Sequence, residues 1–167
     1  MMTRMVLGLA LVALVAACSQ KTESPAAAAA PTAAATGSVT AADFHTELPM
    51  KELMGHVIDN AADGIWLAQG WLINAEGTHE LFPTTDDGWR YASNAAVTLA
   101  EASNLLLLPG RPVDEDRRWV DAAHALHDAA MKAHEMAEKR DKEAFFTAGS
   151  SIYEACVQCH SHYIIGN

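Results

Sequence analysis

The sequence Cys156-Val157-Gln158-Cys159-His160 lies near the end of this chain of 167 residues and decides how the rest is interpreted. Cys-x-x-Cys-His is the signature of c-type haem attachment, in which two thiols reach the two vinyl groups of one porphyrin. On a helix, Cys159 and His160 lie about 60° to one side and about 40° to the other side of Cys156, so all three face one planar ligand. The motif therefore predicts one covalent haem c, held by Cys156 and Cys159, with His160 as the proximal iron ligand.

Two other interpretations of the motif stay open. Cys-x-x-Cys is also the thioredoxin-type dithiol, but that motif belongs near a βαβ pattern, and no strand pattern precedes Cys156. A zinc site using Cys156, Cys159 and either His160 or His162 would lack the second ligand pair that is usual in structural zinc sites. Haem attachment is the preferred interpretation, and a haem-free zinc or dithiol protein is an alternative.

The first residues have the pattern of an export signal. Arg4 precedes an apolar run over 5–17, which is shorter than the roughly 20 residues of a membrane-spanning helix. The run ends in Leu14-Val15-Ala16-Ala17-Cys18, which resembles the lipobox of bacterial lipoproteins. We therefore expect a signal peptide over 1–17, a lipid on Cys18 and a periplasmic lipoprotein anchored to a membrane. An ordinary cleaved signal with an incidental Cys18 is the alternative.

Residues 18–43 are rich in Ala, Pro, Ser and Thr and almost lack large apolar side chains, so we expect a flexible tether there. Without residues 1–17 the chain has 10 basic and 21 acidic side chains, a net charge of −11. Such a surface does not attract nucleic acid, but it would steer basic redox partner proteins. Solubility alone would explain the charge equally well.

Residues 44–167 show helical periodicity and no alternating strand runs. The expected helices cover about 46–73, 84–107, 114–140 and 141 onwards. Residues that begin or cap the last three are Thr84 or Thr85, Asp114 and Asp141. Residues 74–83 are expected to form a loop. Helices of this length with short connections predict the all-α class and an antiparallel four-helix bundle with covalent haem on the C-terminal helix.

A haem motif on the last helix of an Ala-rich bundle resembles the class II cytochromes c, the family of cytochrome c′ and its methionine-ligated relatives. The resemblance covers about residues 44–165 and also rests on Lys51-Glu52-Leu53-Met54. Tyr163 follows the motif where many members carry an aromatic residue. The resemblance implies the same roles for Cys156, Cys159 and His160 as the motif itself. The basic tail that is usual in the family is absent, and family members often dimerise, which leaves a homodimer open.

The resemblance matches Met54 to the distal iron position of the methionine-ligated members. A thioether opposite an imidazole raises the reduction potential, which suits a one-electron carrier rather than an enzyme. In cytochrome c′ itself this position is open, and the iron binds nitric oxide or carbon monoxide; such a gas-binding protein is the main alternative. Met50, one turn earlier, competes with Met54. His56 lies about 200° around the helix from Met54, and a bis-His site that uses His56 is a further alternative.

The remaining candidates are weaker. Three histidines of the third expected helix include an i, i+3 pair that could bind metal, although surface histidines are the simpler interpretation; they are His124, His127 and His134. The tryptophans could flank a porphyrin or fill the core; they are Trp66, Trp71, Trp89 and Trp119. No hydrolase or phosphate-binding motif occurs, so no catalytic residue is assigned.

Overall fold

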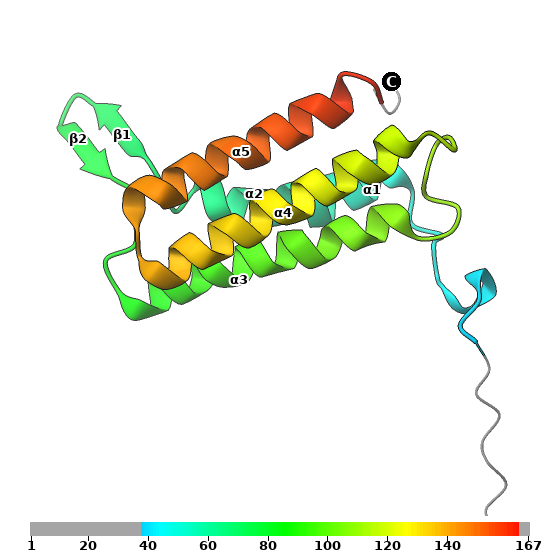
Figure 1. The fold of residues 1–167 in the computed structure, drawn as a ribbon. Coiled ribbons are helices and arrows are strands. Elements are labelled where there is room, and N and C mark those ends of the chain that lie inside the picture. Colours follow the sequence, from blue (N-terminus) through cyan, green and yellow to red (C-terminus); the bar gives the residue numbers. More distant parts are fainter. Residues whose placement is uncertain (1–37, 164–167) are drawn as a thin grey trace, which may run out of the picture. The chain divides into compact units, whose positions relative to one another are not determined.

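Helices form most of the fold in the computed structural model, which describes residues 38–163 (Figure 1). The helical elements are η1 (Ala41–Asp43), α1 (Met50–Leu53), η2 (Met54–Ile58), α2 (Asp59–Trp66), α3 (Asp86–Ser103), η3 (Asn104–Leu107), α4 (Arg117–Lys139) and α5 (Lys142–His160). Four helical segments pack against each other, with α4 running back along α3 and α5 back along α4. The all-α class is confirmed.

The predicted signal peptide over 1–17 and the predicted lipid site Cys18 lie outside the described residues. Of the expected tether over 18–43, only residues 38–43 are described, and their side chains are exposed. Among the helices of residues 38–163, none combines the length and apolarity that a membrane span requires.

The first helical segment is not a uniform α-helix. Between α1 and α2 it contains the π-helical turn η2, in which the backbone N–H of Asp59 donates to the carbonyl of Met54, five residues back. A turn of this kind adds one residue to the helix and changes which side chains share a face. Met54 and Asp59 both line the cavity described below.

Two of the three expected helix starts are confirmed. The side chain of Thr85 accepts a hydrogen bond from the Gly88 N–H at 3.1 Å and caps α3, and Asp141 accepts one from the Ala144 N–H at 3.0 Å and caps α5. The prediction that Asp114 opens the next helix is wrong. Asp116 caps α4 instead.

The physical reason lies in the side chain of Asp114. Its Oδ1 accepts a hydrogen bond from the Asp116 N–H at 3.0 Å, which is an Asx-turn. This turn holds residues 114–116 in a loop conformation. The side chain of Asp116 then accepts the Arg118 N–H at 2.9 Å, so the helix begins at Arg117.

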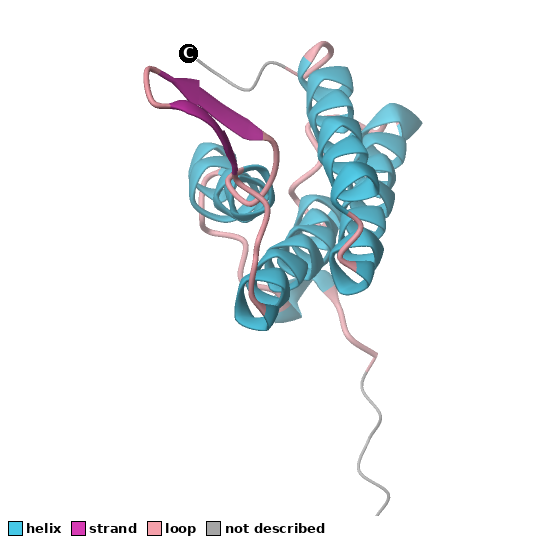
Figure 2. Cartoon of the chain, turned by 90° about the vertical axis from the view of Figure 1, so that its left-hand side faces the viewer, coloured by secondary structure: helices cyan, strands magenta, loops and turns pink. Residues whose placement is uncertain are grey.

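The expectation of a helix through residue 73 and a loop over 74–83 is also wrong. The chain forms a β-hairpin of β1 (Trp71–Asn74) and β2 (Gly77–Glu80), with Trp71 opposite Glu80. The α2 helix ends at Trp66, and Gly70, with φ +85°, adopts the left-handed conformation directly before β1. Seen from the hairpin side, the two strands stand apart from the helices (Figure 2), and Leu72 on β1 is 51% exposed.

Alanine dominates the contact between helices. Buried alanines on facing helices include Ala92, Ala96 and Ala100 of α3 and Ala123, Ala130 and Ala133 of α4. Small side chains let helix backbones approach closely. One close approach is at Gly64 of α2, where an added Cβ would lie 2.7 Å from the Cβ of Ala95. The α2 helix packs against α3 and also contacts α5 (Figure 1), which positions the first helical segment as one wall of the site.

Candidate functional site

A cavity of about 470 Å³ lies between the first helical segment, α4 and α5. This volume falls within the range of about 300–1,000 Å³ that is usual for small-molecule and cofactor sites. Its lining comprises Met54, Gly55, Ile58, Asp59, Ala62, Trp66, Leu106, Trp119, Ala122, Ala123, Leu126, Tyr153, Ala155, Cys156, Cys159 and His160. Most of these side chains are apolar, and the alanines among them leave room for a bulky occupant.

The structure brings together four of the residues singled out in the sequence. Cys156, Cys159 and His160 lie on the wall formed by α5, and Met54 lies on the wall formed by the first helical segment. Both thiols and Met54 are half-buried. An imidazole and two thiols from one helix thus share a single apolar cavity with a thioether from another.

The competing ligands of the first helical segment do not reach this cavity. Met50 packs against the core and is absent from the cavity lining. The side chain of His56 is 74% exposed, and its Nε2 lies 2.9 Å from Glu52 Oε2. His56 therefore faces away from the side that carries Met54, as its position about 200° around the helix predicts.

Both cysteines are free, and their environment keeps them as neutral thiols. Burial raises the pKa of Cys159, and burial together with the nearby Asp59 carboxylate raises the pKa of Cys156. Thiols of this kind are poor nucleophiles near neutral pH, because the reactive species is the thiolate. This environment does not resemble that of a catalytic dithiol, which needs a lowered pKa.

Among the lining residues missed in the sequence are two with polar side chains, Tyr153 and Asp59. Tyr153 precedes Cys156 by three residues and His160 by seven, and this helical spacing could have identified it as a neighbour. Asp59 follows Met54 by five residues, and a regular α-helix would turn it away from the Met54 face. Only the π-helical turn brings it to the cavity, and no pattern in the sequence signals that turn.

The tryptophans divide between the cavity and the rest of the molecule. Trp66 lines the cavity and donates its indole N–H to the Gly149 carbonyl at 3.0 Å, and Trp119 lines it and donates to the Leu106 carbonyl at 2.8 Å. Trp89 packs edge-on against Phe145 in the core. Trp71 lies on the hairpin and packs against Phe82 and Phe146.

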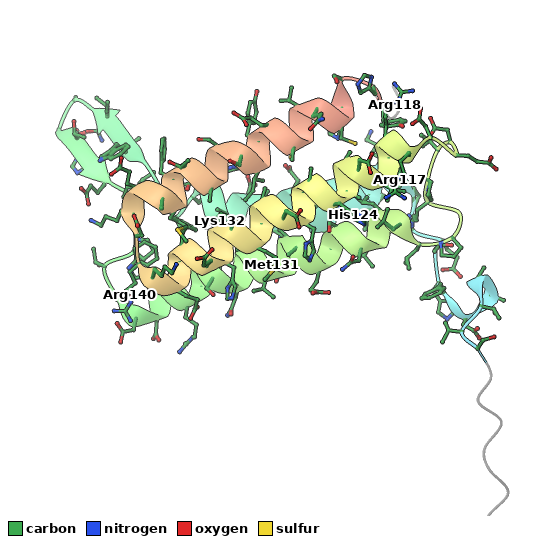
Figure 3. All side chains as sticks on the ribbon, viewed as in Figure 1. Arg117, Arg118, His124, Met131, Lys132 and Arg140 are labelled. Atoms are coloured by element: carbon green, nitrogen blue, oxygen red, sulfur yellow. The ribbon has the colours of Figure 1, made fainter. Side chains whose placement is uncertain are left out.

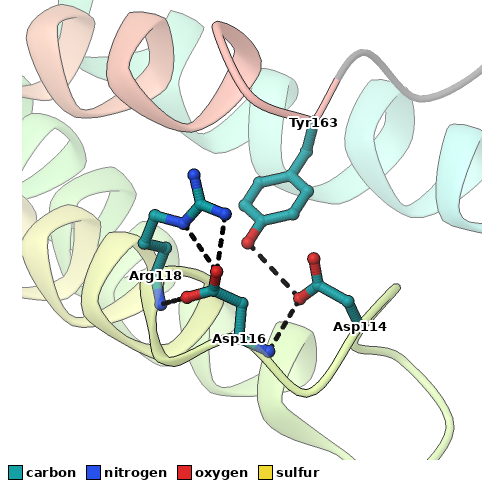
Figure 4. A network of polar contacts seen from close by, with 4 residues as sticks. All are labelled: Asp114, Asp116, Arg118 and Tyr163. Atoms are coloured by element: carbon teal, nitrogen blue, oxygen red, sulfur yellow. Dashed lines mark hydrogen bonds and ion pairs between the residues drawn. The ribbon is translucent and has the colours of Figure 1, made fainter.

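A polar network fixes the end of α5 beside the start of α4 (Figure 4). Tyr163 packs edge-on against Trp119, with ring centroids 5.0 Å apart, and its hydroxyl lies 3.4 Å from Asp114 Oδ1. Hydrogen bonds from the Arg118 side chain and backbone lower the pKa of Asp116. Since Trp119 lines the cavity, this network holds the cavity wall and the helix end that carries His160 together.

Two of the three histidines of α4, His127 and His134, lie next to polar groups of the protein. His127 Nδ1 lies 3.3 Å from Asp128 Oδ1, and His134 Nδ1 lies 2.9 Å from Ser93 Oγ on α3. Within residues 38–163, no group of three or more His, Cys, Asp or Glu side chains is arranged to hold a metal ion. The grouping that the zinc alternative requires is therefore not found in this part of the chain.

The residues of the cavity fit a haem c. The lining offers two unpaired thiols at i, i+3 on α5, an imidazole beside them and a thioether on another wall, all within a largely apolar enclosure.

Comparison with known proteins gave no match: no family model, no curated protein and no solved structure matches the chain.

Proposed function

We propose that this chain is a mono-haem c-type cytochrome of the class II type, built as an antiparallel four-helix bundle, which carries single electrons between partner proteins. The observation that supports the proposal is the shared cavity: Cys156, Cys159 and His160 line one wall and Met54 another. The sequence motif accounts for the first three residues, and the resemblance to methionine-ligated class II cytochromes accounts for the fourth.

Each residue has a defined task in this proposal. Cys156 and Cys159 hold the porphyrin through thioether bonds, His160 is the proximal iron ligand, and Met54 is the distal one. When bound, haem c supplies a one-electron iron couple. The apolar lining of Ile58, Ala122 and the other alanines keeps water away, and the thioether of Met54 favours the reduced state.

The remaining parts of the proposal come from the sequence. A signal peptide over 1–17 and a lipid on Cys18 would anchor the protein to a membrane in the bacterial periplasm. The excess of acidic side chains favours basic redox partners and disfavours nucleic acid. No side chain is assigned to catalysis, so the proposed role is that of a carrier and not of an enzyme.

The absorption spectrum of the reduced protein, expressed with a haem-attachment system, tests the assignment of Met54. We expect a sharp low-spin spectrum that carbon monoxide does not change, because the thioether fills the sixth position. Met54→Ala should open that position and make the spectrum sensitive to the gas. Met50→Ala is the matched control, since Met50 lies outside the cavity lining, and it should behave as the wild type.

A gas-binding protein with open iron is the second candidate. One observation favours it: Gly55 lines the cavity next to Met54, and no described atom outside the local helix lies within 4 Å of the place where a Cβ on Gly55 would stand. Gly55 is exposed, so the cavity is open to small molecules beside Met54. A broad high-spin spectrum that shifts with carbon monoxide in the wild type would support this candidate and exclude Met54 as a ligand.

A further inference from the structure

A hollow between α2 and α5 adjoins the cavity that contains Met54 and the Cys-x-x-Cys-His motif, called the haem cavity below. It has a volume of about 440 Å³ and is lined by Trp66, Gln69, Phe146, Gly149, Ser150, Tyr153 and Glu154. Trp66 and Tyr153 also line the haem cavity, so these two rings separate the hollow from the proposed haem. Any group that enters the hollow would lie one layer of side chains from the cofactor site.

The walls of the hollow have the chemistry of a cation site. Three aromatic residues, Trp66, Phe146 and Tyr153, line the hollow together with Glu154, and Tyr153 is 61% exposed. Aromatic faces attract ammonium groups, and a carboxylate accepts their hydrogen bonds. Within residues 38–163, Glu154 takes part in no ion pair.

Gln69 adds an acceptor to the same hollow. Its side chain is only 8% exposed, and its Oε1 is buried without a hydrogen-bond partner in the described part of the chain. The amide packs so closely on Gly149 that an added Cβ there would lie 1.9 Å from the Gln69 Nε2. A buried acceptor without a donor is unfavourable, and an entering N–H group would relieve this after a small movement of the amide.

The basic side chains labelled on α4 are already paired, so they do not compete for the hollow (Figure 3). Their partners lie on α4 itself or at the start of a neighbouring element: Arg117 with Asp121, Arg118 with Asp116, Lys132 with Glu135, and Arg140 with Asp86. The acidic group of the hollow is thus available to a cation from another molecule.

We propose that this hollow receives a lysine side chain of a basic redox partner, which docks over α2 and α5. The inference rests on the proposed function, because it assigns the place where an electron-carrying partner binds. The ammonium group would donate to Glu154 and Gln69, while its aliphatic stem packs on Phe146. The partner would then lie against Trp66 and Tyr153, whose rings reach the haem cavity.

Titration of the full haem-loaded chain with a peptide of five lysines tests the proposal, with the same peptide acetylated on every lysine as the control probe. The NMR signal of the Trp66 indole N–H reports binding. Glu154→Gln should weaken binding about fivefold, which corresponds to about 1 kcal/mol for an exposed charge pair. Glu143→Gln removes the same charge from an exposed site on α5 outside the hollow, and it should change the affinity less than about twofold.

Equal weakening by the two substitutions would overturn the proposal, because the attraction would then be diffuse. Equal binding of the acetylated peptide would overturn it as well. The absorption spectra of the same samples separate this inference from the proposed function. A wild type that carries haem but shows no difference between Glu154→Gln and Glu143→Gln refutes only the lysine site, whereas a wild type without haem refutes the cytochrome.

Discussion

Replacement of Gly64 by alanine should destabilise the protein, although the same change in a helix interior normally stabilises it. The gain in helix propensity is about 1 kcal/mol. At this position, however, the new methyl group would lie 2.7 Å from the Cβ of Ala95 on α3, and neither methyl can rotate away. The two helices must separate, and overpacking of this kind costs about 1–3 kcal/mol. The expected net loss of unfolding free energy is about 0–2 kcal/mol.

A double-mutant cycle measured by urea denaturation, followed by far-ultraviolet circular dichroism, isolates this contact. In an Ala95→Gly background the clash is absent, so Gly64→Ala should then stabilise the protein by about 1 kcal/mol. The coupling energy between the two positions should be about 1–3 kcal/mol. Gly55→Ala is the control within the same helical segment. Its Cβ would meet no described atom outside the local helix within 4 Å, so this substitution should not destabilise the protein. Equal effects of Gly64→Ala in both backgrounds would refute the close approach of α2 and α3.

Two further predictions concern the cavity wall and the surface of α4. Trp119→Phe removes the indole hydrogen bond to the Leu106 carbonyl, and it should lower the unfolding free energy measured by urea denaturation by about 1–3 kcal/mol. Trp89→Phe is the control, because the buried Trp89 indole makes no such bond among the described residues, and it should lower the unfolding free energy less. A larger loss for Trp89→Phe than for Trp119→Phe would contradict the role of the bond. Glu135 accepts hydrogen bonds from Lys132 and Lys139, which lower its pKa from 4.5 to about 2. The pKa of Glu135 is lower in the folded state than in the unfolded state, so the stabilisation that the Glu135 carboxylate contributes is present above about pH 4.5 and is lost as the pH falls through about 2. An NMR titration of the Glu135 carboxyl should show this low midpoint, and a midpoint near 4.5 would contradict the prediction.

Local chemistry made several features predictable from the sequence. Thr85 and Asp141 cap their helices because a short acceptor side chain directly before a periodic apolar run satisfies the free N–H groups of the first turn. The gathering of Met54 with Cys156 and Cys159 was expected from the resemblance to the methionine-ligated class II cytochromes, and helical periodicity agrees with it because it places Met54 on an inward face. The helix caps depend only on neighbours within one helical turn.

Other features depend on contacts that a single sequence does not reveal. The strands of the hairpin have only four residues each, and Leu72 also fits the helical period of the preceding segment, so the hairpin was taken for a helix end and a loop. Asp114, Glu115 and Asp116 are all suitable caps, and the Asx-turn from Asp114 to Asp116 decides between them. The bond from Trp66 to the Gly149 carbonyl joins residues 83 positions apart.

The mass of the purified protein, produced together with a haem-attachment system, tests the central proposal most directly. We expect the wild type to carry one covalent haem, and a variant with both Cys156→Ala and Cys159→Ala to carry none. A wild type without covalent haem, either loaded with zinc or lighter by two hydrogens through a Cys156–Cys159 disulfide, would contradict the account.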